Sequence, residues 1–530
     1  MKKRENRTIK FPAAEESFKD AGSFINQCLS SEAVSNEIIS ETMLVFEAIF
    51  HNYLAQGLGQ NKTMRLSFLK KFGELVFNIE FEGRMLYLFT DEDSPENRIL
   101  RAYEDRIGSY YRSGINTAQI TVKRVYLTSI IYCTVGLLLA LLIFKPILLW
   151  MPVRPRMMIM GDVLVPCTIL FGNAALMIGA PVTFFSLVKN LIQINIVSTR
   201  GSDIRKLQVK SVMNSLAAIF FAAVAGCLLL QQFILHEQTV KTDIVDSFQK
   251  ALFNLITGSI PASIFEPFES ISPIPLIVLA LLLTYVACSS GRYFNKLEEI
   301  VNICYTVFSK MLGLILFTLP AATFITFLTA LLVEDYSNLV MILKAVLIID
   351  VCMFIYSLIY LYRLKSSGIK VIPFLKKLFP LLLENLRINS AIDAVPFNIR
   401  YCTRHFGMNR KRLEKSLPVL AEINLEGNCL LLMMIGMFVL FGSGESAKWY
   451  VIAIIAFLVL FLSLGAPNQP GSILIGSLII MKYLGYEDPV EIAIYMEVAF
   501  GIFQNILNVI GDVIQMAIYE QQGESASLLK

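Results

Sequence analysis

LPVLAEINLEGNCLLLMMIGMFVLFG, residues 417–442, is an apolar run long enough to cross a bilayer. Its first half nevertheless contains four polar side chains at alternate positions, together with a glycine: Glu422, Asn424, Glu426, Asn428 and Gly427. A charge at membrane depth costs at least about 2.5 kcal/mol, so both carboxylates are expected to face a protein or water interior and to bind something there. The alternative is a structural role, in which neighbouring helices satisfy the two buried carboxylates.

A second polar stripe lies near the C-terminus, in an otherwise apolar segment. Its members follow one another at steps of three or four residues, which places them on one helix face: Glu497, Gly501, Asn505, Asn508 and Asp512. Hard cations prefer carboxylate and carbonyl oxygens, and unwound backbone beside Gly427 would supply carbonyls that a regular helix keeps in its own hydrogen bonds. The two stretches together predict one cation site between two helices.

The composition is that of a polytopic membrane protein. Of the 530 residues, 55% are hydrophobic and 17% are charged, and the mean hydropathy is +0.61. The three histidines and nine cysteines include no CxxC pair, which argues against a zinc site or a disulfide framework. The net charge of +4 gives no indication of a nucleic-acid partner, and residues 1–20 lack the apolar core of a secretory signal.

Residues 1–120 are predicted to form a small soluble α/β domain ahead of the first membrane span. Apolar residues at helical spacing predict a helix over 35–56, and alternating patterns predict strands over 64–69, 75–81 and 117–122.

This first domain is similar to a known fold at one helix and at the end of the strands that follow it. A helix with Glu47 and Asn52, followed by strands that end in FEG at 81–83, resembles the histidine-kinase-like ATPase fold of bacterial anti-sigma factors. In that family an Asp precedes the glycine and a helix Asn binds magnesium. Here Glu82 stands before Gly83 and the Glu-to-Asn spacing differs, so the resemblance implies a degenerate domain without ATPase activity. The alternative is a regulatory or packing domain of unrelated origin.

Apolar runs of membrane length follow from residue 125 onward. They predict spans near 125–149, 160–197, 208–236, 244–288 (broken by prolines), 298–333 and 338–362. Basic side chains then fall on alternate loops of one side, with Arg154 and Arg156 as exceptions: Lys123, Arg124, Arg200, Arg205, Lys206, Lys210, Arg363, Lys365, Lys370, Lys376 and Lys377. This distribution predicts a cytoplasmic N-terminal domain and cytoplasmic termini.

Residues 371–530 contain a repeat, which sets them apart from the spans within 121–370. An interrupted segment over 388–406 precedes the Glu422 helix, and a second one over 450–484, with GAPNQPGS at 465–472, precedes the Asp512 helix. Paired interrupted segments in corresponding positions point to a transporter binding site at a repeat interface. Non-helical backbone at that depth needs cover from protein or from a water-filled cavity.

Residues 160–520 resemble the dicarboxylate/amino acid:cation symporter family, also called the glutamate transporter family. The similar motifs appear in the family's order: GDVL at 161–164, APVTFFSLV at 180–188, NLEGN at 424–428, GAPNQPG at 465–471 and NVIGD at 508–512. NLEGN is similar to the family's Asn-Met-Asp-Gly-Thr signature, and NVIGD to its Asn-Val-Thr-Gly-Asp. The resemblance implies an all-α membrane protein with eight transmembrane helices and two re-entrant helical hairpins, which works as a homotrimeric elevator.

This sequence keeps the family's ligands at one cation site and lacks several of them at another. The resemblance implies a sodium site at Asn424, Asn508 and Asp512, completed by backbone oxygens. Glu426 replaces the signature Asp of another site, whose third-span oxygens are also replaced by Ser215, Ala218 and Ile219. That second site is therefore expected to be lost or rebuilt. Glu422 stands in place of a Thr, and a buried carboxylate there would favour its protonated form, so we expect it to act as a proton carrier.

The residues that handle solute depart from the family pattern. By resemblance, the solute would contact Ser390, Asn428, Ala466, Pro467, Gly471, Gly501, Gln504, Asn505 and Asn508. Gln504 replaces the Arg that pairs with a side-chain carboxylate, Gly501 replaces the Asp that holds the amino group, and Asn428 replaces a Thr, while Asp393 is added at the first hairpin. A glutamine keeps a hydrogen bond but loses bidentate charge pairing, which argues against glutamate as the solute.

These observations predict a secondary symporter in the cell membrane, without a cofactor and without enzymatic activity. It would carry a small organic solute, such as a dicarboxylate or an amino acid, together with sodium, protons or both. The alternative is a transporter-like solute sensor that signals through the N-terminal domain. A third hypothesis, an ATP-driven enzyme or kinase, would need a competent nucleotide pocket in residues 47–83.

Overall fold

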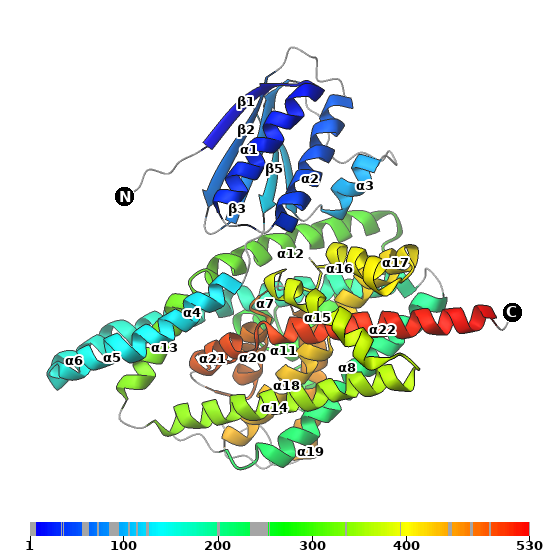
Figure 1. Ribbon diagram of the computed structural model, residues 1–530. Helices are drawn as coiled ribbons and strands as arrows, with labels where there is room; N and C mark the ends of the chain where they lie inside the picture. The colour runs from blue at the N-terminus through cyan, green and yellow to red at the C-terminus, as the bar shows by residue number, and fades with distance from the viewer. Residues whose placement is uncertain are drawn as a thin grey trace. The chain divides into compact units, whose positions relative to one another are not determined.

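The computed structural model describes residues 7–528 apart from several short gaps: 33, 35, 56–62, 72–73, 84–94, 104–105, 113–114, 123–126, 199–201, 234–252, 254, 334–335, 389, 393, 444–447, 467–469 and 487–488. The chain divides into two compact units, Met1–Arg124 and Val125–Lys530, each described here by itself (Figure 1). Among the predicted features, Pro467, Asp393, Lys123 and Arg124 lie outside the described residues.

The first unit is a five-stranded antiparallel sheet covered by helices. Its strands, in the order β1-β2-β3-β5-β4, are β1 (Arg7–Pro12), β2 (Thr63–Lys71), β3 (Glu74–Glu82), β5 (Ile115–Val122) and β4 (Ile107–Arg112). A short 3-10 turn and three helices complete it: η1 (Glu15–Ser17), α1 (Phe18–Ser31), α2 (Asn36–Ala55) and α3 (Pro95–Ala102). Helices α1 and α2 lie along the sheet (Figure 1). Alternate apolar residues of the strands, among them Leu66, Phe77 and Ile120, are buried in one core with those of α1 and α2.

The predicted helix and three strands of this unit correspond to α2, β2, β3 and β5. The α/β class was wrong in one respect, because every strand pairing is antiparallel and the helices gather on the sheet instead of alternating with parallel strands. The unit is therefore an α+β sandwich. Strands β1 and β4 were missed, since each has only six residues and their apolar pattern is weak.

The second unit is helical. Its first half comprises α4 (Leu127–Leu139), η3 (Ala140–Phe144), α5 (Lys145–Trp150), α6 (Val153–Ile159), η4 (Met160–Leu164), α7 (Val165–Ser198), α8 (Ser202–Leu229), α10 (Glu266–Glu269), α11 (Pro273–Ser289), η6 (Gly291–Tyr293), α12 (Phe294–Leu316), α13 (Leu319–Leu332) and α14 (Ser337–Ser366). Its second half comprises α15 (Val371–Ile388), α16 (Val395–Tyr401), η7 (Cys402–Phe406), α17 (Arg410–Ile423), α18 (Glu426–Gly442), α19 (Trp449–Gly465), α20 (Ser472–Tyr483), α21 (Val490–Phe500) and α22 (Phe503–Leu528).

Within the described residues, six helical stretches are long and apolar enough to cross a membrane. They are Ile131–Trp150, Val153–Asn195, Ile204–Leu229, Gly291–Leu316, Ser337–Ser366 and Arg410–Gly442, and a seventh results if α21 and α22, bent by 47°, form one span. The predicted single span over 298–333 was wrong, because the helix breaks between Leu316 and Leu319. Pro320 lies at the start of α13, where it cannot donate a backbone hydrogen bond to the preceding turn.

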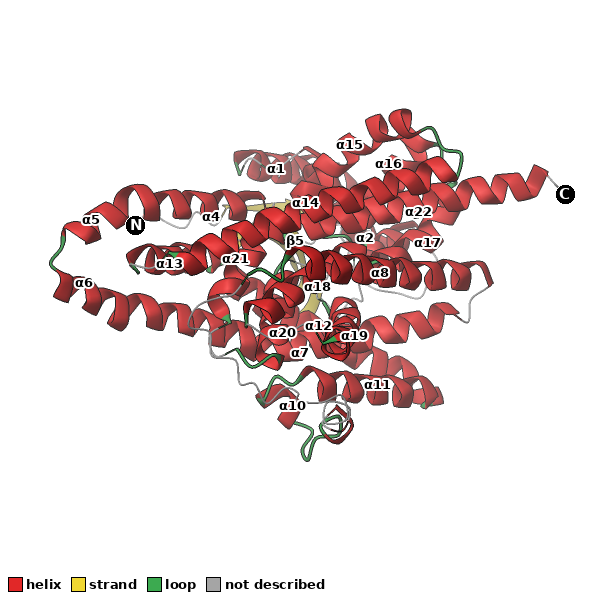
Figure 2. Cartoon of the chain, turned by 90° about the horizontal axis from the view of Figure 1, so that it is seen from below, coloured by secondary structure: helices red, strands yellow, loops and turns green. Residues whose placement is uncertain are grey.

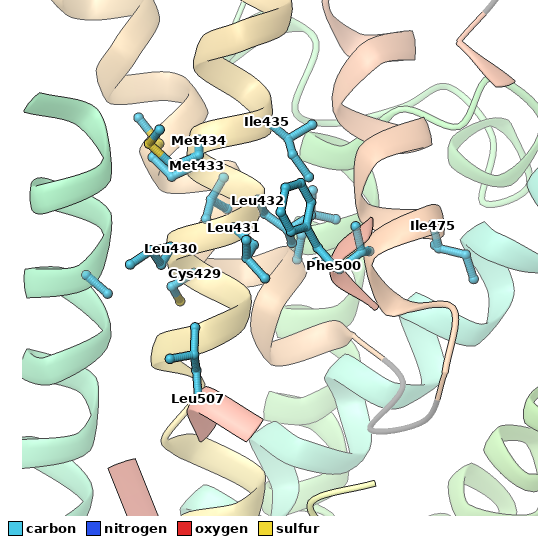
Figure 3. Close-up of a cluster of buried hydrophobic side chains, with 14 of the residues drawn as sticks. Cys429, Leu430, Leu431, Leu432, Met433, Met434, Ile435, Ile475, Phe500 and Leu507 are labelled. Carbon is cyan, nitrogen blue, oxygen red and sulfur yellow. The ribbon is translucent and has the colours of Figure 1, made fainter. Parts of the chain in front are cut away.

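Helix α18 lies at the centre of this unit. All 17 of its residues are buried, and it packs against α8, α19, α20 and α22 (Figure 2). Apolar side chains project from every side of it, and Phe500, Leu507 and Ile475 lie in the same cluster (Figure 3). A helix that is apolar all round and buried all round is an interior element, so its polar first turn is held in place by protein on all sides.

The two interrupted segments form pairs of short helices. In the second pair, α19 and α20 flank a tip in which Gly471 has a φ of 95°, a left-handed conformation that glycine adopts without steric cost. Helix α7 holds the near end of this tip, since Ser186 donates to the carbonyl of Ala466 at 3.2 Å and Asn190 to that of Leu464 at 2.6 Å. In the first pair, Asn385 of α15 and Asn398 of α16 exchange two side-chain hydrogen bonds, at 2.8 and 3.2 Å, which join the two arms.

Candidate solute and cation site

The polar stretch of 422–428 lies where one long helix is interrupted. Helix α17 ends at Ile423 and α18 begins at Glu426, so Asn424 and Leu425 between them have non-helical backbone. Helix α22 crosses at this point. Gly427 permits the close crossing, because a Cβ there would collide with the backbone oxygen of Gln504. The interruption therefore exposes backbone and polar side chains to the facing stripe of α22.

Asn424 and Asp512 meet across this crossing. The Asn424 amide donates from Nδ2 to Oδ1 of Asp512 at 3.0 Å, and both residues are almost completely buried, with 0% and 2% of their surface exposed. Oδ1 of Asn424 is buried and has no hydrogen-bond partner within the described part of the chain. A buried carboxylate beside an unsatisfied amide oxygen is the donor set that a hard cation such as sodium prefers.

Asn508 lies on α22, one turn before Asp512. Its Oδ1 accepts a hydrogen bond from the backbone amide of Gly427 at 2.8 Å, and its Nδ2 lies 3.5 Å from Oδ1 of Asn428. Asn508 thus satisfies one of the open amides at the start of α18, and an amide oxygen retains a second lone pair after that bond. The structure therefore brings four of the predicted residues together: Asn424, Asn428, Asn508 and Asp512.

Glu426 has a counter-charge that the sequence did not reveal. Nη1 of Arg363, in the last turn of α14, lies 3.0 Å from Oε1 and 3.1 Å from Oε2 of Glu426, and Tyr356 donates to Oε2 at 2.6 Å. Arg363 was expected to be a loop charge at the membrane surface, and this assignment was wrong. It pairs with Glu426 instead, because a fully buried carboxylate is strongly destabilising without a counter-charge.

Glu497 is a member of the predicted stripe that was not expected to bind anything in particular. It is 1% exposed, and its carboxylate accepts hydrogen bonds from the backbone amides of Gly471 and Leu474, both at 2.9 Å. These amides belong to the start of α20, which has free donors and a partial positive charge. Gly501 lies one turn further along, and a Cβ there would come within 2.8 Å of the Glu497 carboxyl carbon. The sequence shows an acid at helical spacing from Gly501 but does not show which helix end it meets.

Gln504 also contacts the tip between α19 and α20, which is called the second tip below. Its Nε2 donates to Oγ of Ser472 in a short hydrogen bond, while its Oε1 is buried without a partner within the described residues. The buried amide oxygen therefore points to a second place where a polar ligand group would be favourable.

The remaining predicted residues lie in several environments. Ser390, Asn505 and Ala466 are buried, and Glu422 is half-buried on α17, two residues before the helix break. Ser215 is buried on α8, and its hydroxyl has no hydrogen-bond partner in the described part of the chain. No group of three His, Cys, Asp or Glu side chains in the described ranges is arranged to hold a metal ion.

The N-terminal unit does not bring its two motif residues to one place. Glu47 is exposed, whereas Asn52 is buried on another face of α2 and donates to Oδ1 of Asn97 at 2.9 Å. The neighbouring Tyr53 is buried against the ring of Phe81, and this burial raises the pKa of its hydroxyl to about 12.

A helical membrane unit with broken helices that cross at buried polar groups is the architecture of a secondary transporter. A model of the sodium:dicarboxylate symporter family matches residues 130–521, which is more than half of the chain. The chain therefore belongs to the sodium:dicarboxylate symporter family. A search of curated proteins finds no match.

Proposed function

We propose that this protein is a symporter of a small organic solute in the cell membrane, coupled to sodium and, through Glu422, to protons. The observation that carries the proposal is the buried pair of Asp512 and Asn424 at a helix break, in which the Asn424 amide nitrogen donates to the Asp512 carboxylate and the Asn424 amide oxygen has no partner within the described residues. Asp512 has no cationic side chain paired with it in the described part of the chain. A mobile cation is therefore the natural counter-charge at this position.

The cation site in this proposal comprises Asn424, Asn508 and Asp512, with a backbone oxygen at the α17–α18 break. The solute would bind between the two tips and α22. The proposed contacts are Ser390, Asn428, Ala466, Pro467, Gly471, Gly501, Gln504, Asn505 and Asn508. At the break, the carbonyl of Ile423 accepts from the Leu425 amide at 3.1 Å and that of Leu425 from the Cys429 amide at 2.9 Å, so the backbone oxygen proposed as a cation ligand is that of Asn424.

The proposed architecture has eight spans and two re-entrant hairpins, which are α15–α16 and α19–α20. The second hairpin would act as the outer gate, and the helices that carry both hairpins would move across the membrane as an elevator within a homotrimer. The apolar residues that η3 and α14 expose, such as Leu142 and Phe354, support lipid or subunit contact at those surfaces. The termini and the N-terminal unit are proposed to be cytoplasmic.

The solute is proposed to be a neutral polar compound or a carboxylate that does not need a pairing arginine. Gln504 supports this, because its amide gives hydrogen bonds without a full charge.

The experiment that tests the function is uptake into proteoliposomes. A panel of labelled amino acids and dicarboxylates is supplied with an inward gradient of sodium, of protons, or of neither. Accumulation of one solute only with a sodium gradient is expected. Accumulation that is the same with and without ion gradients would contradict ion coupling.

The separate N-terminal unit favours a second candidate function, a solute sensor. Met1–Arg124 forms its own sheet and core, which transport itself does not require. In this case the membrane unit would bind solute and sodium without accumulating solute, and solute would alter partner binding by the N-terminal unit. The same uptake assay, combined with a binding assay, distinguishes the two functions.

A further inference from the structure

The membrane unit contains two buried acids on either side of one glycine. A Cβ placed on Gly511 would lie 3.1 Å from Oε1 of Glu426 and 2.8 Å from Nδ2 of Asn424, the residue that donates to Asp512. Glu426 and Asp512 are 0% and 2% exposed. Two buried carboxylates this close repel each other unless positive charge balances them.

The chain itself balances one of the two. Arg363 is held in place by more than its ion pair, because its guanidinium lies 5.6 Å from the ring centre of Tyr360. Tyr360 in turn packs edge-on against Tyr356, which donates to Glu426, and its own hydroxyl donates to the carbonyl of Leu507 on α22 at 3.3 Å. The guanidinium is therefore built into the packing between α14, α18 and α22.

A covalently attached cation differs from a bound ion in one respect that matters for transport. It cannot leave, so the negative charge of Glu426 stays neutralised whether or not ions are present in solution. Of these two acids, Asp512 is the one that has no cationic side chain paired with it in the described part of the chain.

We propose that Arg363 is a resident counter-ion that takes the place of a coupling cation at Glu426, so that the transport cycle binds one cation fewer than the buried pair of Glu426 and Asp512 would require. Arg363 then determines the coupling stoichiometry, although it contacts no solute. This inference rests on the proposed sodium coupling at Asp512.

The test measures how strongly sodium stabilises the full-length purified protein. Thermal unfolding is followed over a series of sodium chloride concentrations, with choline chloride added to hold the ionic strength constant. At saturating sodium, each bound ion raises the folding equilibrium constant about tenfold for a tenfold rise in sodium. The slope of stability against the logarithm of sodium concentration therefore reports the number of bound ions.

Arg363→Gln is expected to bind a second sodium ion beside Glu426 and to show about twice the slope of the wild type. Arg363→Lys keeps the positive charge and is expected to keep the wild-type slope. The double variant Arg363→Gln/Glu426→Gln has neither charge and is expected to return to the wild-type slope. This reversal separates a counter-ion from a residue that only fills space.

An Arg363→Gln slope equal to that of the wild type would overturn the inference. If this variant does not fold at any sodium concentration while the double variant does, the inference also fails, because an ion from solution then cannot take the place of the guanidinium. A wild type without any sodium dependence would instead overturn the proposed site at Asp512. In that case a slope gained by Arg363→Gln would still support the role of Arg363.

Discussion

The carboxylate of Glu497 accepts a hydrogen bond from the backbone amide of Gly471 at 2.9 Å, and through its other oxygen it accepts one from Leu474. An acid of α21 thus satisfies two amides at the start of α20, where the helix dipole favours negative charge. The second tip is held at one end by this carboxylate and at the other by Ser186 and Asn190 of α7.

Glu497→Gln should loosen the second tip. Glutamine keeps the size of the side chain but loses its charge and one acceptor oxygen, and a hydrogen bond to a charged group contributes about 1.5–3 kcal/mol. We expect a cysteine introduced at Ala466 to react with a thiol reagent about tenfold faster in this background, above the rate of the native cysteines. Glu491→Gln, which alters an acid of the same helix that accepts from Tyr495 at 3.2 Å, serves as the control. Equal rates in all backgrounds would argue against a holding role for Glu497.

Asp512→Asn should abolish sodium-driven uptake while leaving assembly intact. The amide keeps the shape of the side chain but removes the charge that the cation is proposed to balance. Uptake is measured in proteoliposomes, and assembly by size-exclusion chromatography. Asp350→Asn, which alters an exposed acid of α14, is the matched control and should transport normally. Solute accumulation by Asp512→Asn with an unchanged sodium dependence would show that the site assignment is wrong.

Gly511→Ala should weaken sodium binding through steric pressure alone. The added methyl group would lie 2.8 Å from Nδ2 of Asn424 and 3.1 Å from Oε1 of Glu426, so both side chains must move. Overpacking of this kind costs about 1–3 kcal/mol, which corresponds to a loss in sodium affinity of about 5- to 150-fold. Gly313→Ala is the control, because no atom lies within 4 Å of the added Cβ there. Equal sodium affinities for the two variants would contradict the crowding at Gly511.

Acidic amino acids should bind more weakly than neutral polar solutes or other carboxylates. No arginine stands at 504 and no aspartate at 501, so neither the carboxylate nor the amino group of glutamate finds a paired charge there. Calorimetric titration of the purified protein measures the affinities. Tight glutamate or aspartate binding that Gln504→Ala leaves unchanged would refute this prediction.

The N-terminal unit should not hydrolyse ATP. Asn52 donates to Asn97 inside the unit and Glu47 is exposed elsewhere on α2, so the two do not form one nucleotide pocket. The full-length protein should release phosphate no faster than a buffer blank. Magnesium-dependent turnover that Asn52→Ala removes would favour the ATP-driven alternative. Deletion of residues 1–120 is expected to leave solute binding intact and to alter transport rate or oligomer stability.

Several features of the fold follow from local patterns in the sequence. The apolar length of 417–442 and the spacing of the C-terminal stripe predict two interior helices that cross at polar residues, and the structure places Asn424 and Asp512 together as that pattern indicates. Helix α2 and strand β3 were likewise predictable, because side-chain periodicity reports which face of an element is buried. The break between α12 and α13 was missed, since the apolar run continues through it and only Pro320 marks it.

The sequence by itself determined the membrane class, the family motifs and the buried acids, because these depend on hydropathy and on residues close together in the chain. Only the tertiary structure decided how each acid is balanced. In the sequence, Arg363 stands among basic residues that predict a surface loop. In the structure, it lies at the end of α14 and its guanidinium pairs with Glu426, 63 residues further along the chain. Glu497 likewise meets the start of α20 at Gly471, 26 residues earlier in the chain. Charge pairing at low dielectric depends on distance in space, and helical periodicity carries no information about which distant helix supplies the partner.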